Sequence, residues 1–193
     1  MGSQVHGTQT FDKAKRSELK FSDSAIHEVQ KIISHYPEGK QKSALLPILH
    51  IAQAEFGGWL SPETMDYVAS VLNIKPIEVF EVASFYTMYN LKPMGKCVLE
   101  VCQTSSCWLN GAEDIVKYIE KKLNIKVGET TKDGMFSLKV AECLGSCGTA
   151  PMLQCGASYH ENLTYEKVDA LLENYKNDNR LRSYTDLDYK NTV

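Results

Sequence analysis

Four cysteines in two close pairs are the residues of this sequence whose type and spacing can carry chemistry. Cys102 and Cys107 form a C-x4-C pair, and Cys143 and Cys147 form a C-x3-C pair. Each pair follows a short run of β-forming residues, so each is expected where a strand gives way to a loop. Two thiolate pairs that converge from two strand ends can hold an iron–sulfur cluster or a zinc ion.

The two remaining cysteines, Cys97 and Cys155, are expected to be packing residues. Cys97 also has C-x4-C spacing to Cys102, but it lies inside a strand-like run, where its side chain would point toward a core. Unpaired cysteines are among the most buried residue types. The first ten residues are polar and carry no export signal, so we expect a reducing compartment, in which thiols rather than disulfides persist.

Glycines and hydroxyl residues flank both pairs. Gly145 and Gly148 would let the backbone wrap closely and aim N–H groups at sulfur. Thr104, Ser105 and Ser106 are expected to do the same in the first loop.

Spacing alone leaves an iron–sulfur cluster and a structural zinc ion open. Zinc sites tolerate both spacings. The C-x4-C-x2-C spacing of plant-type ferredoxins and the C-x-x-C pair of thioredoxin-like redox enzymes are both absent from the sequence. Two functions from different classes therefore remain, an electron-transfer protein and a zinc-stapled adaptor module.

Composition indicates an ordinary globular protein of 193 residues, with a hydrophobic share of 43% and a charged share of 23%. The net charge of -3 gives no support for nucleic-acid binding, which usually needs a basic patch. No apolar run is long enough for a membrane span, so we expect no direct membrane insertion.

The chain divides into an arm over residues 1–20, a helical bundle over 21–90 and an α/β unit over 96–176. Four helices are expected in the bundle, because Ser22, Ser61-Pro62 and Pro76 mark helix starts and Gly57-Gly58 and Asn73 mark ends. The fourth helix should turn Val79, Phe80 and Ala83 inward. The aromatic stretch 84–89 is expected to pack between the two units, with a partner contact as the alternative.

In the α/β unit the pattern predicts the order strand, helix, strand, strand, strand, helix. A strand ends at Cys102 and an amphipathic helix spans 110–123. The runs 127–131 and 135–141 flank an Asp133-Gly134 turn, which predicts a hairpin. A strand over 152–155 and a helix over 164–175 follow. Residues 177–193 should form an extended tail, either disordered or laid on a partner. The predicted fold class is therefore α/β (α+β).

Four motifs resemble those of one known family. They are V-C-x4-C-x3-G (Val101–Gly111), E-C-L-G-x-C-x2-A-P-M (Glu142–Met152), F-G-G-W-L-S-P-E-T (Phe56–Thr64) and V-A-S-F-Y-T-M-Y (Val82–Tyr89). The sequence resembles the thioredoxin-like [2Fe–2S] subunit of NADH dehydrogenases, which is the 24 kDa subunit of mitochondrial complex I and its bacterial counterpart. The resemblance covers about residues 22–175.

The resemblance implies a helical bundle followed by a thioredoxin-like [2Fe–2S] ferredoxin domain. It implies that Cys102, Cys107, Cys143 and Cys147 ligate one [2Fe–2S] cluster. Pro151 resembles the proline that thioredoxin-like folds place beside their active loop, where the preceding peptide bond is often cis, so a cis Ala150–Pro151 bond is a hypothesis.

The implied partners are a subunit that binds FMN and NADH, on which the bundle docks, and other peripheral-arm subunits of the dehydrogenase. The implied role is one-electron exchange with reduced FMN, with no dehydrogenase activity in the isolated chain. The implied location is the cytoplasmic face of the bacterial inner membrane, or the matrix side in a eukaryote. Complex I is the default host, and an NAD-linked hydrogenase or formate dehydrogenase is the alternative.

Overall fold

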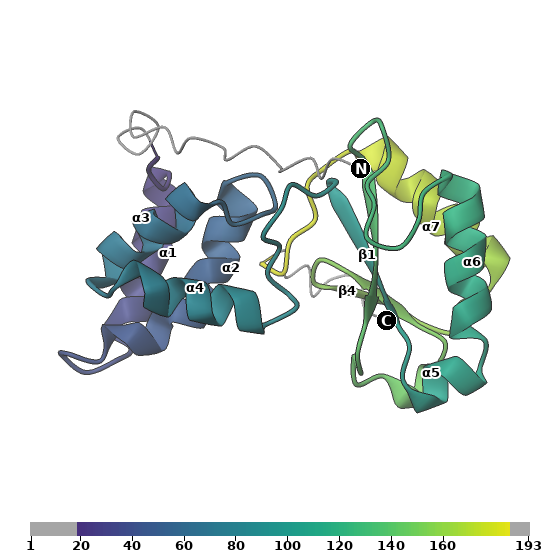
Figure 1. Ribbon diagram of the computed structural model, residues 1–193, viewed down its shortest axis with the longest axis horizontal. Helices are drawn as coiled ribbons and strands as arrows, with labels where there is room; N and C mark the ends of the chain where they lie inside the picture. Colours follow the sequence, from purple (N-terminus) through teal and green to yellow (C-terminus); the bar gives the residue numbers. More distant parts are fainter. Residues whose placement is uncertain (1–18, 186–193) are drawn as a thin grey trace, which may run out of the picture.

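The computed structural model describes residues 19–185, which form two groups of elements side by side (Figure 1). One group consists of helices only, and the other is built on a four-stranded sheet. The arm predicted for residues 1–20 falls almost entirely outside the described residues. None of the helices within 19–185 combines the length and the apolar composition needed to cross a membrane.

The helical group consists of α1 to α4 and one short 3-10 helix. Its bounds are α1 Asp23–Ser34, η2 Gln41–Ala44, α2 Leu45–Glu55, α3 Pro62–Leu72 and α4 Pro76–Phe85. The predicted start and stop residues are confirmed, since the Ser22 and Ser61 hydroxyls accept hydrogen bonds from backbone N–H groups of the first helical turns. Asn73 ends α3 in the left-handed conformation, with φ 52°.

The helical group has its own apolar core. Side chains from all four α-helices are fully buried there, including Val29, Ile48, Leu49, Val68 and Val79. The prediction that Phe80 points inward is wrong, because its side chain is 47% exposed. Val79 and Ala83, four residues apart, define the buried face of α4, and the next residue after Val79 is turned by about 100° away from that face.

The sheet has the order β2-β1-β3-β4. Its strands are β1 Cys97–Cys102, β2 Phe136–Ala141, β3 Leu153–Cys155 and β4 Ser158–His160. Strands β1 and β2 are parallel, while β3 is antiparallel to both of its neighbours. Since parallel strands end at the same edge, the chain leaves β1 and β2 side by side, with Cys102 opposite Ala141.

Helices cover one face of the sheet. They are α5 Ser105–Leu109, α6 Ala112–Leu123 and α7 Tyr165–Asp178. Figure 1 shows α6 and α7 on the face of the sheet that points away from the helical group. Leu99, Ile119, Phe136, Leu138 and Leu153 are fully buried in the core between the sheet and these helices.

Some predicted elements of this unit were wrong. Residues 127–131 do not form a strand, and within them Thr130 alone makes an isolated bridge to Ser137. Gly128, with φ +89°, bends this segment out of the extended conformation. The turn at Asp133-Gly134 is confirmed, because the Asp133 carboxylate accepts a hydrogen bond from the Met135 N–H at 3.0 Å. The short elements η2, α5 and β4, which have only three to five residues each, were not predicted.

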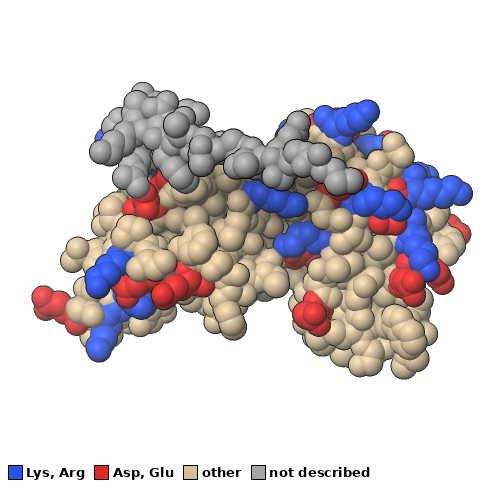
Figure 2. All heavy atoms as spheres, viewed as in Figure 1, with Lys and Arg blue, Asp and Glu red and all other residues tan. Residues whose placement is uncertain are grey.

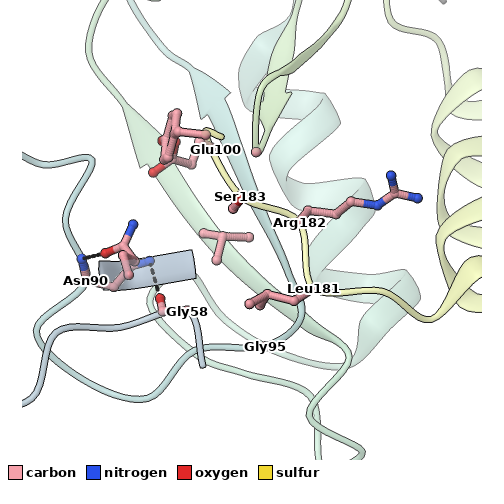
Figure 3. A pocket seen from close by; sticks show the side chains of 11 residues that line it. Gly58, Asn90, Gly95, Glu100, Leu181, Arg182 and Ser183 are labelled. Carbon is pink, nitrogen blue, oxygen red and sulfur yellow. Dashed lines mark hydrogen bonds between the residues drawn. The ribbon is translucent and has the colours of Figure 1, made fainter. Parts of the chain in front are cut away.

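The described part of the tail lies on the chain itself. We call residues 181–185 the C-terminal strap. Figure 3 shows Leu181, Arg182 and Ser183 on one stretch of chain that starts beside Glu100 of the sheet and faces the segment that holds Gly58 and Asn90. The strap leaves a cavity of about 20 Å³ beside it, which is room for roughly one water molecule. The prediction of a disordered or partner-bound tail is therefore wrong for the strap, and residues 186–193 lie outside the described residues.

Two glycines make room for the strap. A Cβ atom at Gly156 would stand 2.7 Å from the backbone oxygen of Ser183. A Cβ atom at Gly58 would meet Leu181 at 3.0 Å. The Arg182 N–H also donates to the Lys96 carbonyl at 2.7 Å. The strap is thus fitted to the sheet on one side and to the helical group on the other.

A buried ion pair joins the strap, the sheet and the segment after α4. The Lys139 ammonium lies 2.8 Å from the Glu100 carboxylate, whose side chain is 8% exposed. The Tyr184 hydroxyl donates to the other oxygen of Glu100. Lys139 also donates to the Thr87 carbonyl at 2.7 Å and to the Asn90 side-chain oxygen at 3.2 Å. One charged pair therefore connects β1, β2, the strap and the helical side.

Replacing Lys139 with Met should lower the free energy of unfolding by about 3 kcal/mol, because the Glu100 charge would stay buried without its partner. Urea denaturation measures the change. Lys132→Met, in an exposed turn, is the control and should change stability little. Adding Glu100→Gln to Lys139→Met should restore most of the loss, since no unpaired charge remains. A Lys139→Met protein as stable as the control would contradict this role of the pair.

Candidate metal centre

The parallel pairing of β1 and β2 brings the two cysteine pairs to one edge of the sheet. Cys102 is the last residue of β1, and Cys107 follows in α5. Cys143 stands two residues beyond the end of β2, and Cys147 begins the 3-10 helix η3, Cys147–Thr149. The pairs meet at the end of the sheet where Figure 1 shows α5.

The thiols meet as two pairs. The Sγ atoms of Cys143 and Cys147 are 4.0 Å apart. Two sulfurs on one tetrahedral metal with bonds of about 2.3 Å are separated by about 3.8 Å, so this pair is spaced as two ligands of one metal are. Cys102 and Cys107 also interact directly through their thiols. Within residues 19–185, no three His, Cys, Asp or Glu side chains form a group that could hold a single metal ion.

Backbone N–H groups point at the sulfurs. The Gly145 N–H donates to the Cys143 thiol, which confirms the prediction for Gly145. The Leu144 N–H donates to Cys102. The Met152 N–H donates to Cys107. The same role for Gly148 stays a prediction. Such donors stabilise negative charge on sulfur, which both thiolate ligands and an iron–sulfur cluster need.

These contacts divide each pair into one acidic and one less acidic thiol. The Gly145 N–H, the Thr104 hydroxyl and the Cys147 thiol lower the pKa of Cys143, and the same thiol contact raises the pKa of Cys147. Burial disfavours ionisation of Cys102, but hydrogen bonds from Thr104 and Leu144 outweigh it and lower its pKa. Burial and the neighbouring Cys102 raise the pKa of Cys107 to about 11.

The hydroxyl side chains of the first loop make different contacts. The Thr104 hydroxyl lies 3.5 Å from the Cys102 sulfur, as predicted. Ser106 does not serve a sulfur; its hydroxyl donates to the Cys147 backbone carbonyl at 2.8 Å and so ties α5 to the second cysteine pair. Ser105 is exposed.

The centre is buried on one side and open on the other. Cys102 and Cys107 are buried, whereas Cys143 and Cys147 are exposed. Beside them α5 presents two apolar side chains to solvent, Trp108 at 59% and Leu109 at 75% exposed. Figure 2 shows few charged side chains over this end of the molecule. An exposed edge of this kind suits contact with another protein.

Cys97 and Cys155 are confirmed as packing residues, buried in β1 and β3. They lie beside a cluster of polar side chains from α7, β4 and the strap. The Arg182 guanidinium stands 4.6 Å from the centre of the Tyr175 ring. The Tyr175 hydroxyl and His160 Nε2 are 2.7 Å apart. Burial, with a smaller contribution from the Arg182 charge, lowers the pKa of His160 to about 4.

Sequence reasoning missed two side chains that touch the second cysteine loop. The Tyr159 hydroxyl donates to the Leu144 carbonyl at 2.6 Å. The Glu161 carboxylate accepts from the hydroxyls of Ser146 and Thr149. The signal available was the turn at Gly156 directly after the strand that ends at Cys155, which is typical of a hairpin. The predicted cis bond between Ala150 and Pro151 is confirmed.

Comparisons with known proteins show what the chain is similar to. The sequence pattern of the thioredoxin-like [2Fe-2S] ferredoxin family matches residues 29–176. The chain is 45% identical over 158 residues to the E subunit of NADH-quinone oxidoreductase from Rickettsia felis, and the match covers 82% of this chain and 95% of that protein. It is 40% identical over 169 residues to the mitochondrial NADH dehydrogenase [ubiquinone] flavoprotein 2 of Dictyostelium discoideum, covering 88% of this chain and 68% of that one.

Solved structures share the fold. An NAD+-reducing [NiFe]-hydrogenase in its H2-reduced state superposes with a TM-score of 0.61 at 20% identity, over 69% of this chain and 22% of the hydrogenase chain. Its air-oxidised form superposes with a TM-score of 0.60. This chain thus spans about a fifth of the hydrogenase chain, and the likeness shows the fold alone.

Replacing His160 with Gln should flatten the pH dependence of stability. The unfolded chain protonates this histidine near pH 6.5, whereas the folded chain does so near pH 4, so folding loses stability as the pH falls between these values. From pH 7.5 to 5.5 the residue should account for a loss of about 1.4 kcal/mol, which urea denaturation of His160→Gln should no longer show. Exposed His27→Gln should behave as the wild type, and an unchanged slope in His160→Gln would contradict the assignment.

Proposed function

Because the chain belongs to the thioredoxin-like [2Fe-2S] ferredoxin family, we propose that it is the electron-transfer subunit of an NADH:quinone oxidoreductase. One observation carries the proposal. The two thiol pairs lie at the same end of the parallel strands β1 and β2. The chain that carries them matches 95% of the length of a protein named as a subunit of that enzyme. In this proposal the chain would contribute a cluster, and the dehydrogenase activity would belong to the assembled enzyme.

The four cysteines would hold one [2Fe–2S] cluster, with Cys102 and Cys107 on one iron and Cys143 and Cys147 on the other. The spacing of 4.0 Å within the second pair and the N–H groups aimed at three sulfurs support this assignment. When bound, such a cluster takes up and returns single electrons. The protein residues keep the sulfurs apart in two pairs and stabilise their negative charge through fixed donors.

The proposed partner is the NADH-oxidising subunit that carries FMN, within a peripheral arm of further subunits. The helical group would dock on it. Its α4 exposes three large apolar side chains, Ile77, Phe80 and Phe85. Aromatic residues in such positions are enriched at protein interfaces. The predicted packing role of residues 84–89 holds for buried Tyr89, whereas Phe85 is 78% exposed and favours the partner contact.

The host is proposed to be a complex I-type dehydrogenase, at the cytoplasmic face of the bacterial inner membrane or on the matrix side in a eukaryote. The 45% identity to the E subunit of NADH-quinone oxidoreductase supports this host, whereas the hydrogenase structure is 20% identical to the chain. An NAD-linked hydrogenase or a formate dehydrogenase is the alternative host. The alternative function from another class is an adaptor module in which the four cysteines bind a structural zinc ion.

Substituting Cys102 or Cys143 with Ser should abolish the cluster. The anaerobically purified wild type should be brown, contain two irons per chain and give an EPR signal on reduction with dithionite. Each serine variant should lose most of its iron and visible absorbance, because one iron loses a thiolate. Cys97→Ser is the matched control, and it should keep both. A colourless wild type with one zinc per chain would establish the adaptor instead, and loss of colour in Cys97→Ser would show that the quartet is wrong.

Phe85→Asp should weaken binding to the flavin subunit at least tenfold, since a charge would enter the apolar contact. Co-purification and titration with that subunit measure the effect. Iron content should stay unchanged, because Phe85 lies on α4 and is exposed in the isolated chain. Tyr36→Asp, at another exposed aromatic position of the helical group, should bind as the wild type. Equal affinity of both variants for the flavin subunit would show that α4 is not part of the interface.

A further inference from the structure

The loop that carries Cys143 and Cys147 has little regular structure of its own. It leaves β2 at Ala141 and reaches η3 only at Cys147. Gly145 takes φ +83° at its centre. Both cysteine side chains are exposed, so core packing does not fix them. A loop of this kind samples many conformations unless side chains outside it restrict the backbone.

Two side chains of the β4 region restrict it. The Tyr159 hydroxyl donates to the carbonyl of Leu144, the residue next to Cys143, at 2.6 Å. The Glu161 carboxylate accepts from the Ser146 hydroxyl, next to Cys147, and from the Thr149 hydroxyl at 2.7 Å. Each contact fixes a residue adjacent to, or two positions beyond, one of the exposed cysteines.

Strand alternation explains why these two residues act together. Tyr159 and Glu161 are two positions apart, so they project from the same side of the chain. His160, between them, projects to the other side, where it meets the Tyr175 hydroxyl of α7. The β4 region therefore packs on α7 through one residue and holds the cysteine loop through the two beside it.

In the Glu161 contact, hydrogen bonds can be donated in one direction only. A carboxylate accepts hydrogen bonds and has no proton to give, so both hydroxyls must donate to it. Both donate to the same oxygen, Oε1. The Ser146 hydroxyl, followed by the Thr149 hydroxyl, lowers the pKa of Glu161. A neutral amide oxygen at the same place could accept both bonds.

We infer that Tyr159 and Glu161 are positioning residues for the metal centre. They hold the second cysteine loop in the one shape in which Cys143 and Cys147 face Cys102 and Cys107. This inference rests on the proposed function, since it assigns the two residues a role toward the [2Fe–2S] cluster. Neither residue touches a sulfur, and both act through the loop backbone and its hydroxyls.

The experiment compares cluster stability and spectrum in Glu161→Ala, Glu161→Gln and Tyr159→Phe. The loss of visible absorbance is followed in the presence of an iron chelator, and EPR spectra of the reduced proteins are recorded. We expect Tyr159→Phe, which loses one hydrogen bond, to lose absorbance about fivefold faster than the wild type, and Glu161→Ala, which loses two, to lose it faster still. Their EPR g values should shift, because the sulfurs of one iron change position. Glu161→Gln should restore both the rate and the spectrum.

Controls and outcomes separate this inference from the proposed function. Glu38→Ala and Tyr36→Phe alter exposed residues of the helical group and should match the wild type in both measurements. If Glu161→Ala and Tyr159→Phe match these controls, or if Glu161→Gln fails to restore the spectrum, the positioning role is overturned while the cluster stands. If the wild type itself holds zinc and no iron, the proposed function fails first.

Discussion

The parallel pairing of β1 with β2 is the constraint on which the rest of the structure depends. Antiparallel strands would place the residues that follow them at opposite edges of the sheet, whereas parallel strands end together. The register sets Cys102 beside Ala141, so the chain releases both cysteine loops at neighbouring points. The crossover through α5 and α6 that parallel strands require also supplies Cys107. Strand direction thus turns two distant sequence motifs into one centre.

A second constraint fixes the helical group against the sheet. The Glu100–Lys139 pair is costly to bury, and its cost is offset only while the strap and the segment after α4 complete its hydrogen bonds. The pair therefore favours one arrangement of the two groups over others. The rings of His50 and Tyr184, 5.2 Å apart, add a contact between helix α2 and the strap. As a result, the segment that follows α4 is tied to the strands that carry the cysteine pairs.

The sequence predicted those features that local residues determine. Single residues mark the serine caps, the helix start at Ser61-Pro62 and the helix end at Asn73. Alternation predicts β1, and spacing identifies the four cysteines. Helix α5 and the strap could not be predicted in this way, because contacts far along the chain stabilise them. Tyr184, for example, pairs with a carboxylate 84 residues away. The prediction that Phe80 points inward was wrong because apolar character alone does not show which face of a helix is covered.

The asymmetry of the cysteine centre follows from how its two halves are supported. Cys102 and Cys107 belong to a strand and a helix, so the core that buries them also fixes their positions. Cys143 and Cys147 stand in solvent, where added negative charge is hydrated at lower cost than in the core. That openness removes core packing as a support, and side chains of the β4 region replace it through polar contacts. The proposed cluster would thus be held by groups that leave its outer side uncovered.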